Sequence, residues 1–86
     1  MAEKAKKKVR YAWDASHNGC YIRAWTEGRG RDKEIIVHVW TSGKVEGEPD
    51  GDWAMPGSLP LDAAIAQAIV NTRRDLENAK DGRSRK

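Results

Sequence analysis

The run Ile35-Ile36-Val37-His38-Val39-Trp40 constrains the fold of this chain more than any other feature of its sequence. Four of these six side chains are β-branched, which favours a strand, and we place that strand over residues 34–41. Alternate residues of a strand point to opposite faces of its sheet, and here both sets are largely apolar. Each face of the sheet therefore needs cover from a helix, a loop or a partner.

A hairpin is predicted upstream of this strand. Residues 8–14 alternate between apolar and polar side chains, the pattern of a half-buried strand. Asn18-Gly19 is a strong hairpin signal, because both residues tolerate positive φ angles. We therefore expect residues 20–27 to return antiparallel, and the glycine-rich, charged residues 28–33 to form an exposed loop. The apolar face of the first strand is expected to hold Val9, Tyr11 and Trp13.

Downstream, residues 42–57 are rich in glycine and proline and are expected to form mainly loop, with a short fourth strand at 44–46. Trp53 and Met55 are expected to pack this loop against the core. A helix is predicted from Ser58, its candidate N-cap, with Pro60 in the first turn and an end near Lys80. Its apolar stripe comprises Leu61, Ile65, Ala68, Ile69, Thr72 and Leu76.

These elements define a fold class: a small α+β domain of β-β-β-(β)-α order, with a three- or four-stranded antiparallel sheet packed by one C-terminal helix. At 86 residues there is room for one domain, which we place at 8–80 between disordered basic tails at 1–7 and 81–86. Residues 1–10 carry a net charge of +4, residues 80–86 carry +3, and the part between them carries −4. The basic pI is thus a property of the ends, and the body is acidic.

The composition also excludes several kinds of function. Cys20 is the only cysteine, so the chain needs no oxidising compartment, and with no apolar signal or spanning segment we expect a cytoplasmic protein without membrane contact. His17, His38 and Cys20 belong to no recognisable catalytic signature. His17-x-x-Cys20 has the spacing of two zinc ligands but lacks the other two. We expect no enzyme, no cofactor and no metal.

The second face of the sheet is the most informative candidate site. If the helix covers the aliphatic side chains, the residues left outward mix aromatic rings with Arg and His, a combination suited to contacts with protein or with unstacked bases. The alternative reverses the faces, because a chain without Phe needs its Trp residues in the core, and the other face then forms a homodimer interface. The outward candidates are Tyr21, Arg23, Trp25, His38 and Trp40.

Two charged loops extend this candidate surface. The acidic residues of the 46–52 loop are candidates for contact with an Arg-rich protein surface, although a solvated loop is the simpler interpretation. Basic residues of the 28–33 loop, together with Arg23 and the tails, are the alternative candidates for contact with phosphates. The acidic set is Glu46, Glu48, Asp50 and Asp52, and the basic set is Arg29, Arg31 and Lys33.

The order of hairpin, third strand, loop and helix resembles known families in topology. With Asn18-Gly19-Cys20-Tyr21 entering the second strand and Leu61-Asp62-Ala63-Ala64 opening the helix, it resembles the antitoxin domain of HicB type over about two thirds of the chain. The same order resembles the DNA-binding arm domains of phage integrases. Any function drawn from shared topology is analogy.

The sequence thus favours a small binding protein without enzymatic activity. The leading hypothesis is a protein-docking inhibitor or accessory factor, of phage or mobile-element type, that acts on a host nucleic-acid-handling complex. The first alternative is a direct DNA- or RNA-binding module whose affinity falls with salt. The second is a homodimeric structural protein that pairs through the second sheet face.

Overall fold

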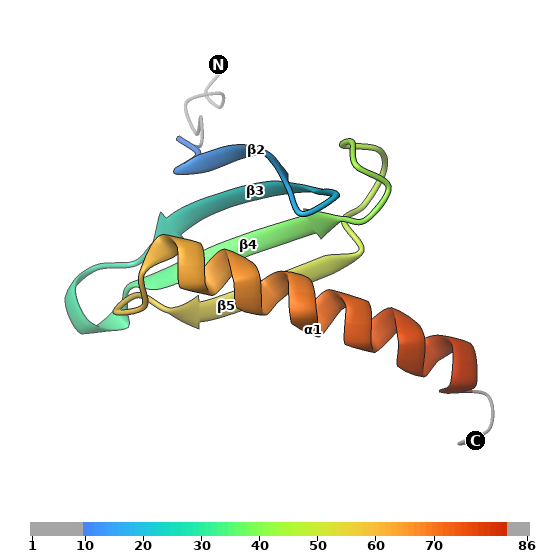
Figure 1. Ribbon diagram of the computed structural model, residues 1–86. Coiled ribbons are helices and arrows are strands. Elements are labelled where there is room, and N and C mark those ends of the chain that lie inside the picture. Colours follow the sequence, from blue (N-terminus) through green and yellow to red (C-terminus); the bar gives the residue numbers. More distant parts are fainter. Residues whose placement is uncertain (1–9, 83–86) are drawn as a thin grey trace, which may run out of the picture.

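The computed structural model describes residues 10–82, which form an antiparallel sheet of four strands packed on one side by a single helix (Figure 1). The strands lie in the order of the chain, β2-β3-β4-β5, and the expected α+β class with its C-terminal helix is confirmed. The elements are β2 (Trp13–His17), β3 (Cys20–Glu27), the 3-10 turn η1 (Gly30–Asp32), β4 (Glu34–Trp40), β5 (Gly51–Pro56) and α1 (Leu61–Gly82).

The β2–β3 hairpin turns at the expected dipeptide. Asn18 and Gly19 have φ angles of 52° and 82°, and the hairpin closes on the His17–Cys20 pair. The expected strand at 8–14 is wrong in its bounds, since β2 begins at Trp13 and the chain bends at Ala12. Because of that bend Tyr11 and Trp13 do not share a face: Trp13 packs against the core, whereas Tyr11 contacts Trp25 on the opposite side. Residues 8 and 9 lie outside the described part.

The fourth strand is β5, and the expected strand at 44–46 is wrong. The segment 41–50 is a loop that Asp50 holds closed by accepting hydrogen bonds from the backbone N–H and hydroxyl of Thr41, both at 2.7 Å. Strand pairing then begins with Gly51 opposite Val39. Trp53 and Met55 therefore reach the core from a strand and not from a loop.

The helix covers the aliphatic face of the sheet, so the alternative with reversed faces is wrong. Ile22 and Val37 from the sheet and Ile65 from α1 are fully buried at the centre of this core. The tryptophans of this face lie at its two margins, Trp13 on one edge strand and Trp53 on the other. Small and branched side chains thus fill the centre of the core, and the large rings close its sides.

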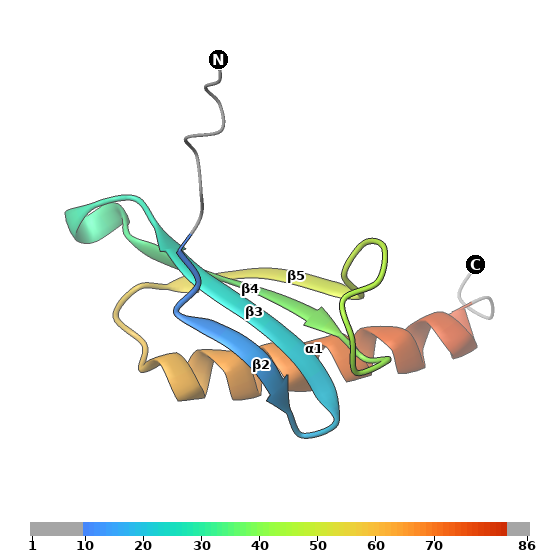
Figure 2. The ribbon, with the colours of Figure 1, turned by 90° about the horizontal axis from the view of Figure 1, so that it is seen from above.

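The helix begins later and ends later than expected. The Pro60 carbonyl accepts the first intrahelical hydrogen bond, from the Ala64 N–H at 3.0 Å, so Pro60 holds the N-cap position and Ser58 lies in the preceding turn. At the other end α1 continues past the sheet to Gly82 (Figure 2). Leu76, expected in the buried stripe, is therefore exposed. Of the disordered tails expected at 1–7 and 81–86, residues 1–7 and 83–86 lie outside the described part, whereas residues 81 and 82 belong to α1.

No helix within residues 10–82 is long and apolar enough to cross a membrane.

Candidate functional site

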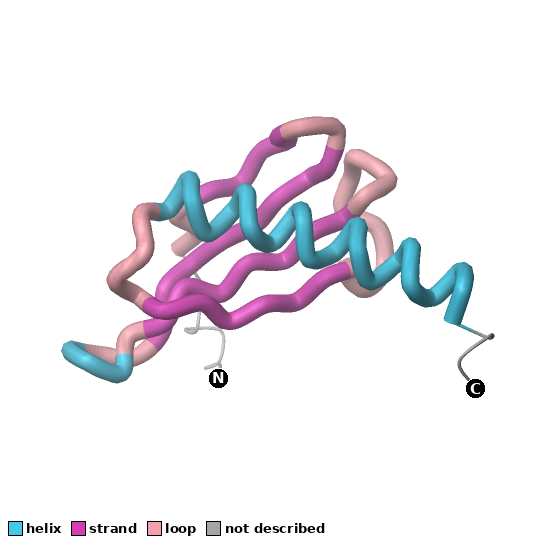
Figure 3. Tube along the Cα trace, turned by 60° about the horizontal axis from the view of Figure 1, so that its bottom comes forward, coloured by secondary structure: helices cyan, strands magenta, loops and turns pink. Residues whose placement is uncertain are grey.

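The face of the sheet opposite α1 carries the candidate site. Figure 3 shows the helix lying across one side of the four strands, and residues 10–82 form no second α-helix that could cover the other side. We call this other side the open face. Strand alternation and pairing place on it Asp14 and Ser16 from β2, Tyr21, Arg23 and Trp25 from β3, Ile36, His38 and Trp40 from β4, and Asp52 and Ala54 from β5.

Aromatic rings form a continuous chain over the open face. Tyr11 meets Trp25 with ring centroids 5.7 Å apart, Trp25 meets His38 at 4.8 Å, and His38 meets Trp40 at 5.9 Å. Tyr21 extends the chain, with its centroid 6.5 Å from that of Trp40. All four contacts are edge-to-face, the favoured arrangement for rings that carry a quadrupole. The rings therefore hold one another in a fixed surface.

A row of acidic, basic and histidine side chains crosses the same face between the aromatic groups. We call Asp14, Arg23, His38 and Asp52 the charged row. Asp14 pairs with Arg23, Arg23 with His38, and His38 with Asp52, one residue from each of the four strands. Arg23 Nε donates to Asp14 Oδ1 at 3.1 Å, and His38 Nε2 lies 3.2 Å from Asp52 Oδ1. A carboxylate therefore ends the row on each edge strand.

Asp14 accepts a hydrogen bond from Arg23, and its neighbours lower its pKa. The Tyr21 hydroxyl donates to Asp14 Oδ1 at 2.6 Å, and this hydrogen bond, followed by that from Arg23, lowers the pKa of Asp14. The same hydrogen bond to Asp14 raises the pKa of Tyr21, because a phenolate could not donate it and would face a carboxylate. The Arg23 guanidinium lies 4.8 Å from the centroid of Tyr11, within range of a cation–π contact.

Trp40 lies on the open face but is not exposed there, which corrects one expected contact residue. Its side chain is only 5% exposed, and its indole N–H donates to the Gly47 carbonyl at 3.3 Å. The 41–50 loop thus folds over Trp40. Glu46 and Glu48, which flank Gly47, are exposed beside this end of the face.

The candidate acidic residues divide into different roles. Asp50 closes the 41–50 loop through Thr41, and Asp52 belongs to the charged row. Glu27, at the far end of β3, accepts a hydrogen bond of 2.8 Å from the Trp25 indole. Carboxylates therefore border the aromatic chain at several points.

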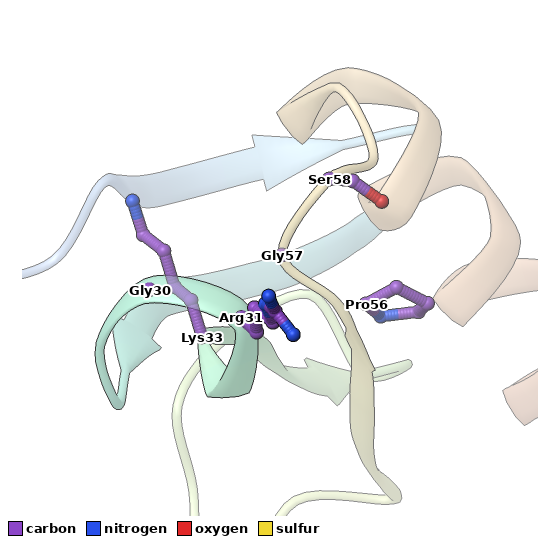
Figure 4. A pocket seen from close by; sticks show the side chains of 6 residues that line it. All are labelled: Gly30, Arg31, Lys33, Pro56, Gly57 and Ser58. Carbon is purple, nitrogen blue, oxygen red and sulfur yellow. The ribbon is translucent and has the colours of Figure 1, made fainter.

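The three basic candidates lie at the opposite end of the sheet, away from the 41–50 loop. Arg31 and Lys33 line a shallow pocket with Pro56, Gly57 and Ser58, where η1 meets the turn before α1 (Figure 4). The Lys33 carbonyl accepts a hydrogen bond from Gly57 N–H at 3.0 Å, which joins the two loops. Arg29 precedes η1 and is exposed. The paired residues Glu27 and Glu34 separate this loop from Arg23, so the structure does not bring the four basic candidates together.

Sequence reasoning missed Tyr11 and Asp14 as members of this surface. It placed Ile36 on the same side of its strand as His38 but did not name it as a contact residue. One signal for Asp14 was present: a two-residue turn at Asn18-Gly19 pairs residue 17 with 20 and therefore residue 14 with 23. The place of Tyr11 had no such signal, since it depends on the bend at Ala12.

Comparison with protein-family models, with curated proteins and with solved structures returned no match to this chain. Among residues 10–82 no group of three or more His, Cys, Asp or Glu side chains is placed to hold a metal ion. His17 and Cys20 are cross-strand neighbours, but His17 packs against Trp13 and Cys20 is buried beside Arg73.

Proposed function

We propose that this chain is a binding protein without a catalytic role, which docks a protein partner through its open face. The observation that carries the proposal is the chain of interlocked rings on a sheet face that the described helix leaves uncovered. Aromatic residues and Arg dominate the energetics of protein interfaces, and rigid rings lose little conformational entropy on binding. Their edge-to-face contacts prepare such a surface before a partner arrives.

The charges on this face favour protein over nucleic acid. The charged row ends in Asp14 and Asp52, and Arg23 is already paired with Asp14. Residues 10–82 contain nine Lys and Arg against twelve Asp and Glu, so the body repels phosphates overall. An acidic body of this kind suits an inhibitor or accessory factor of a complex that handles nucleic acid, because such complexes present basic grooves.

Selection from a displayed library of random peptides tests the docking surface. The full chain serves as bait, and Trp25→Ser is the face variant, with circular dichroism confirming that it folds. Val70→Asp is the matched control, because Val70 is 47% exposed on the helix. We expect enriched peptides to bind the wild type and Val70→Asp equally, and Trp25→Ser at least about tenfold more weakly. Peptides that bind all three proteins alike would exclude the open face as the docking site.

A further inference from the structure

Acidic residues gather at the end of the open face next to the 41–50 loop, and their charge indicates which side chains a partner should carry. Segment 41–52 contains four carboxylates and one cation, Lys44, and the Trp40–Gly47 hydrogen bond holds its loop against the sheet. Asp52 contributes the most accessible charge of the row, with 69% of its side chain exposed. A docked segment that covers His38 and Trp25 would lie directly beside Asp52.

Cationic side chains match both components of this surface. Carboxylates at the rim attract Lys and Arg, and the guanidinium of Arg also stacks on aromatic rings. The face itself contains an example of this stacking in Arg23 over Tyr11. An acidic partner segment would instead meet Asp52 and the loop carboxylates with like charge, which costs binding energy.

Building on the proposed docking function, we infer that the partner segment on the open face carries Lys or Arg side chains, which pair with Asp52 and with Glu46 and Glu48 of the loop. The apolar part of the same segment packs on Trp25 and Ile36. This end of the face therefore fixes the orientation of the partner, since the opposite end carries the Arg29–Lys33 loop.

Charge also argues against the two other occupants. In a second copy of this chain, the charged row again ends in Asp14 and Asp52, so two open faces would bring acidic edges together in a face-to-face pair. A nucleic-acid strand would place its phosphates against the same carboxylates.

The test uses three synthetic twelve-residue peptides that alternate Leu with Arg, with Gln or with Glu, titrated into the full chain and followed by tryptophan fluorescence. We expect the Leu-Arg peptide to bind most tightly, and its affinity to fall about fivefold or more in the double variant Glu48→Gln, Asp52→Asn. Glu77→Gln, which removes an exposed carboxylate of α1, is the matched control and should leave the affinity unchanged.

Other outcomes would overturn the inference. If the Leu-Arg peptide binds the double variant as tightly as the wild type, these carboxylates do not contact the peptide. Sedimentation of the chain alone as a dimer that Trp25→Ser dissociates would assign the face to a second copy. Oligonucleotide binding that Trp25→Ser abolishes would assign it to nucleic acid. If the library instead enriches face-dependent peptides that lack Lys and Arg, the docking function stands and the inference fails; if it enriches none that depend on the face, the docking function itself fails.

Discussion

Gly51 lies beneath the hydrogen bond that joins β5 to the helix. The Trp53 indole donates to the Thr72 hydroxyl at 2.8 Å, and that hydroxyl donates to the Ala68 carbonyl at 2.8 Å. A Cβ at Gly51 would come within 2.0 Å of Thr72 Oγ1 and 2.6 Å of Trp53 Nε1. At this position glycine is required for space, because one additional methyl group would separate the strand from the helix.

We therefore predict that Gly51→Ala lowers the free energy of unfolding by about 1–3 kcal/mol, the usual cost of overpacking. Urea unfolding followed by tryptophan fluorescence measures it. In a Thr72→Ala background the clash is smaller, so the same substitution should cost less there, and the double-mutant cycle should show coupling. Additive effects of the two substitutions would contradict this account.

Asp14 makes the stability of the open face depend on pH. Its pKa is lower in the folded protein than the ordinary value of 3.8, so its ionised form stabilises the fold above that value. This stabilisation is lost as the pH falls through the folded pKa, when the carboxylate no longer accepts from both Tyr21 and Arg23.

Asp14→Asn should therefore flatten the loss of stability on acidification below about pH 4 relative to the wild type. Tyr21→Phe removes the donor with the largest effect on the Asp14 pKa. It should therefore reduce the loss of stability at acid pH in part. Urea midpoints measured from pH 6 to pH 2 test both variants. If Asp14→Asn loses as much stability on acidification as the wild type, other carboxylates cause that loss.

At the scale of elements, α1 is divided into a packed half and a projecting half. Ile65 is 1% exposed against the sheet, whereas Leu76 is 41% exposed beyond it. Ile65→Ala should cost about 2–5 kcal/mol of unfolding free energy, and Leu76→Ala less than about 0.5 kcal/mol. Thermal or urea unfolding compares the two variants. A large loss in Leu76→Ala would reveal that the projecting half is packed in solution, by self-association if the loss depends on protein concentration.

The helix also clamps the β2–β3 hairpin. Arg73 Nη2 donates to the Asn18 carbonyl at 2.7 Å, so the helix holds a turn that is 55 residues away in sequence. Arg73→Met keeps most of the aliphatic stem and should lower stability by about 0.5–1.5 kcal/mol, with faster amide hydrogen exchange at residues 18–20. Arg74→Met, at the adjacent exposed position, is the matched control. Equal exchange in both variants would show that Arg73 does not hold the turn.

Local signals determined which elements could be predicted. The bounds of β3 were predicted correctly because Asn18-Gly19 precedes it and Gly28 follows it, and the β-branched run placed β4 to within one residue. β5 was missed because Gly51 and Pro56 within it and Pro49 just before it are typical of loops, while its pairing with β4 is a contact between segments that no local pattern indicates. The end of the helix stripe was missed because periodicity gives the buried side of a helix but not where the sheet beneath it stops.

In the candidate site, too, local patterns could be predicted from the sequence, whereas contacts between separate segments could not. Alternation along β3 and β4 correctly grouped Tyr21, Arg23, Trp25 and His38 on one side, but sequence left open which side the helix covers. Packing determines which face the helix covers. The buried side of α1, with the small residues Ala64 and Ala68, packs against the aliphatic face of the sheet. That Trp40 would be covered by the 41–50 loop depends on a tertiary hydrogen bond with no local signal.

For the whole molecule, the distribution of charge separates two ways of binding. The basic residues concentrate in 1–10 and 80–86, whereas residues 11–79 carry a net charge of −4. Polycations bind duplex DNA without sequence preference by releasing counterions, and the logarithm of affinity falls by about 0.9 per phosphate contact for each decade of salt. An acidic body contributes nothing to that process, so nucleic-acid binding by the full chain should come from its ends.

We predict that the full chain binds a mixed-sequence duplex weakly and in a strongly salt-dependent manner, and that replacing Lys4, Lys6, Lys7 and Lys8 together with Arg83, Arg85 and Lys86 by Gln removes this binding. Arg23→Gln should leave it unchanged, because that guanidinium is already paired with Asp14. Fluorescence anisotropy of a labelled duplex at two salt concentrations measures all three proteins. Binding that persists without the terminal charges and is lost in Arg23→Gln would identify the open face as a nucleic-acid surface, and would reject protein docking as its function.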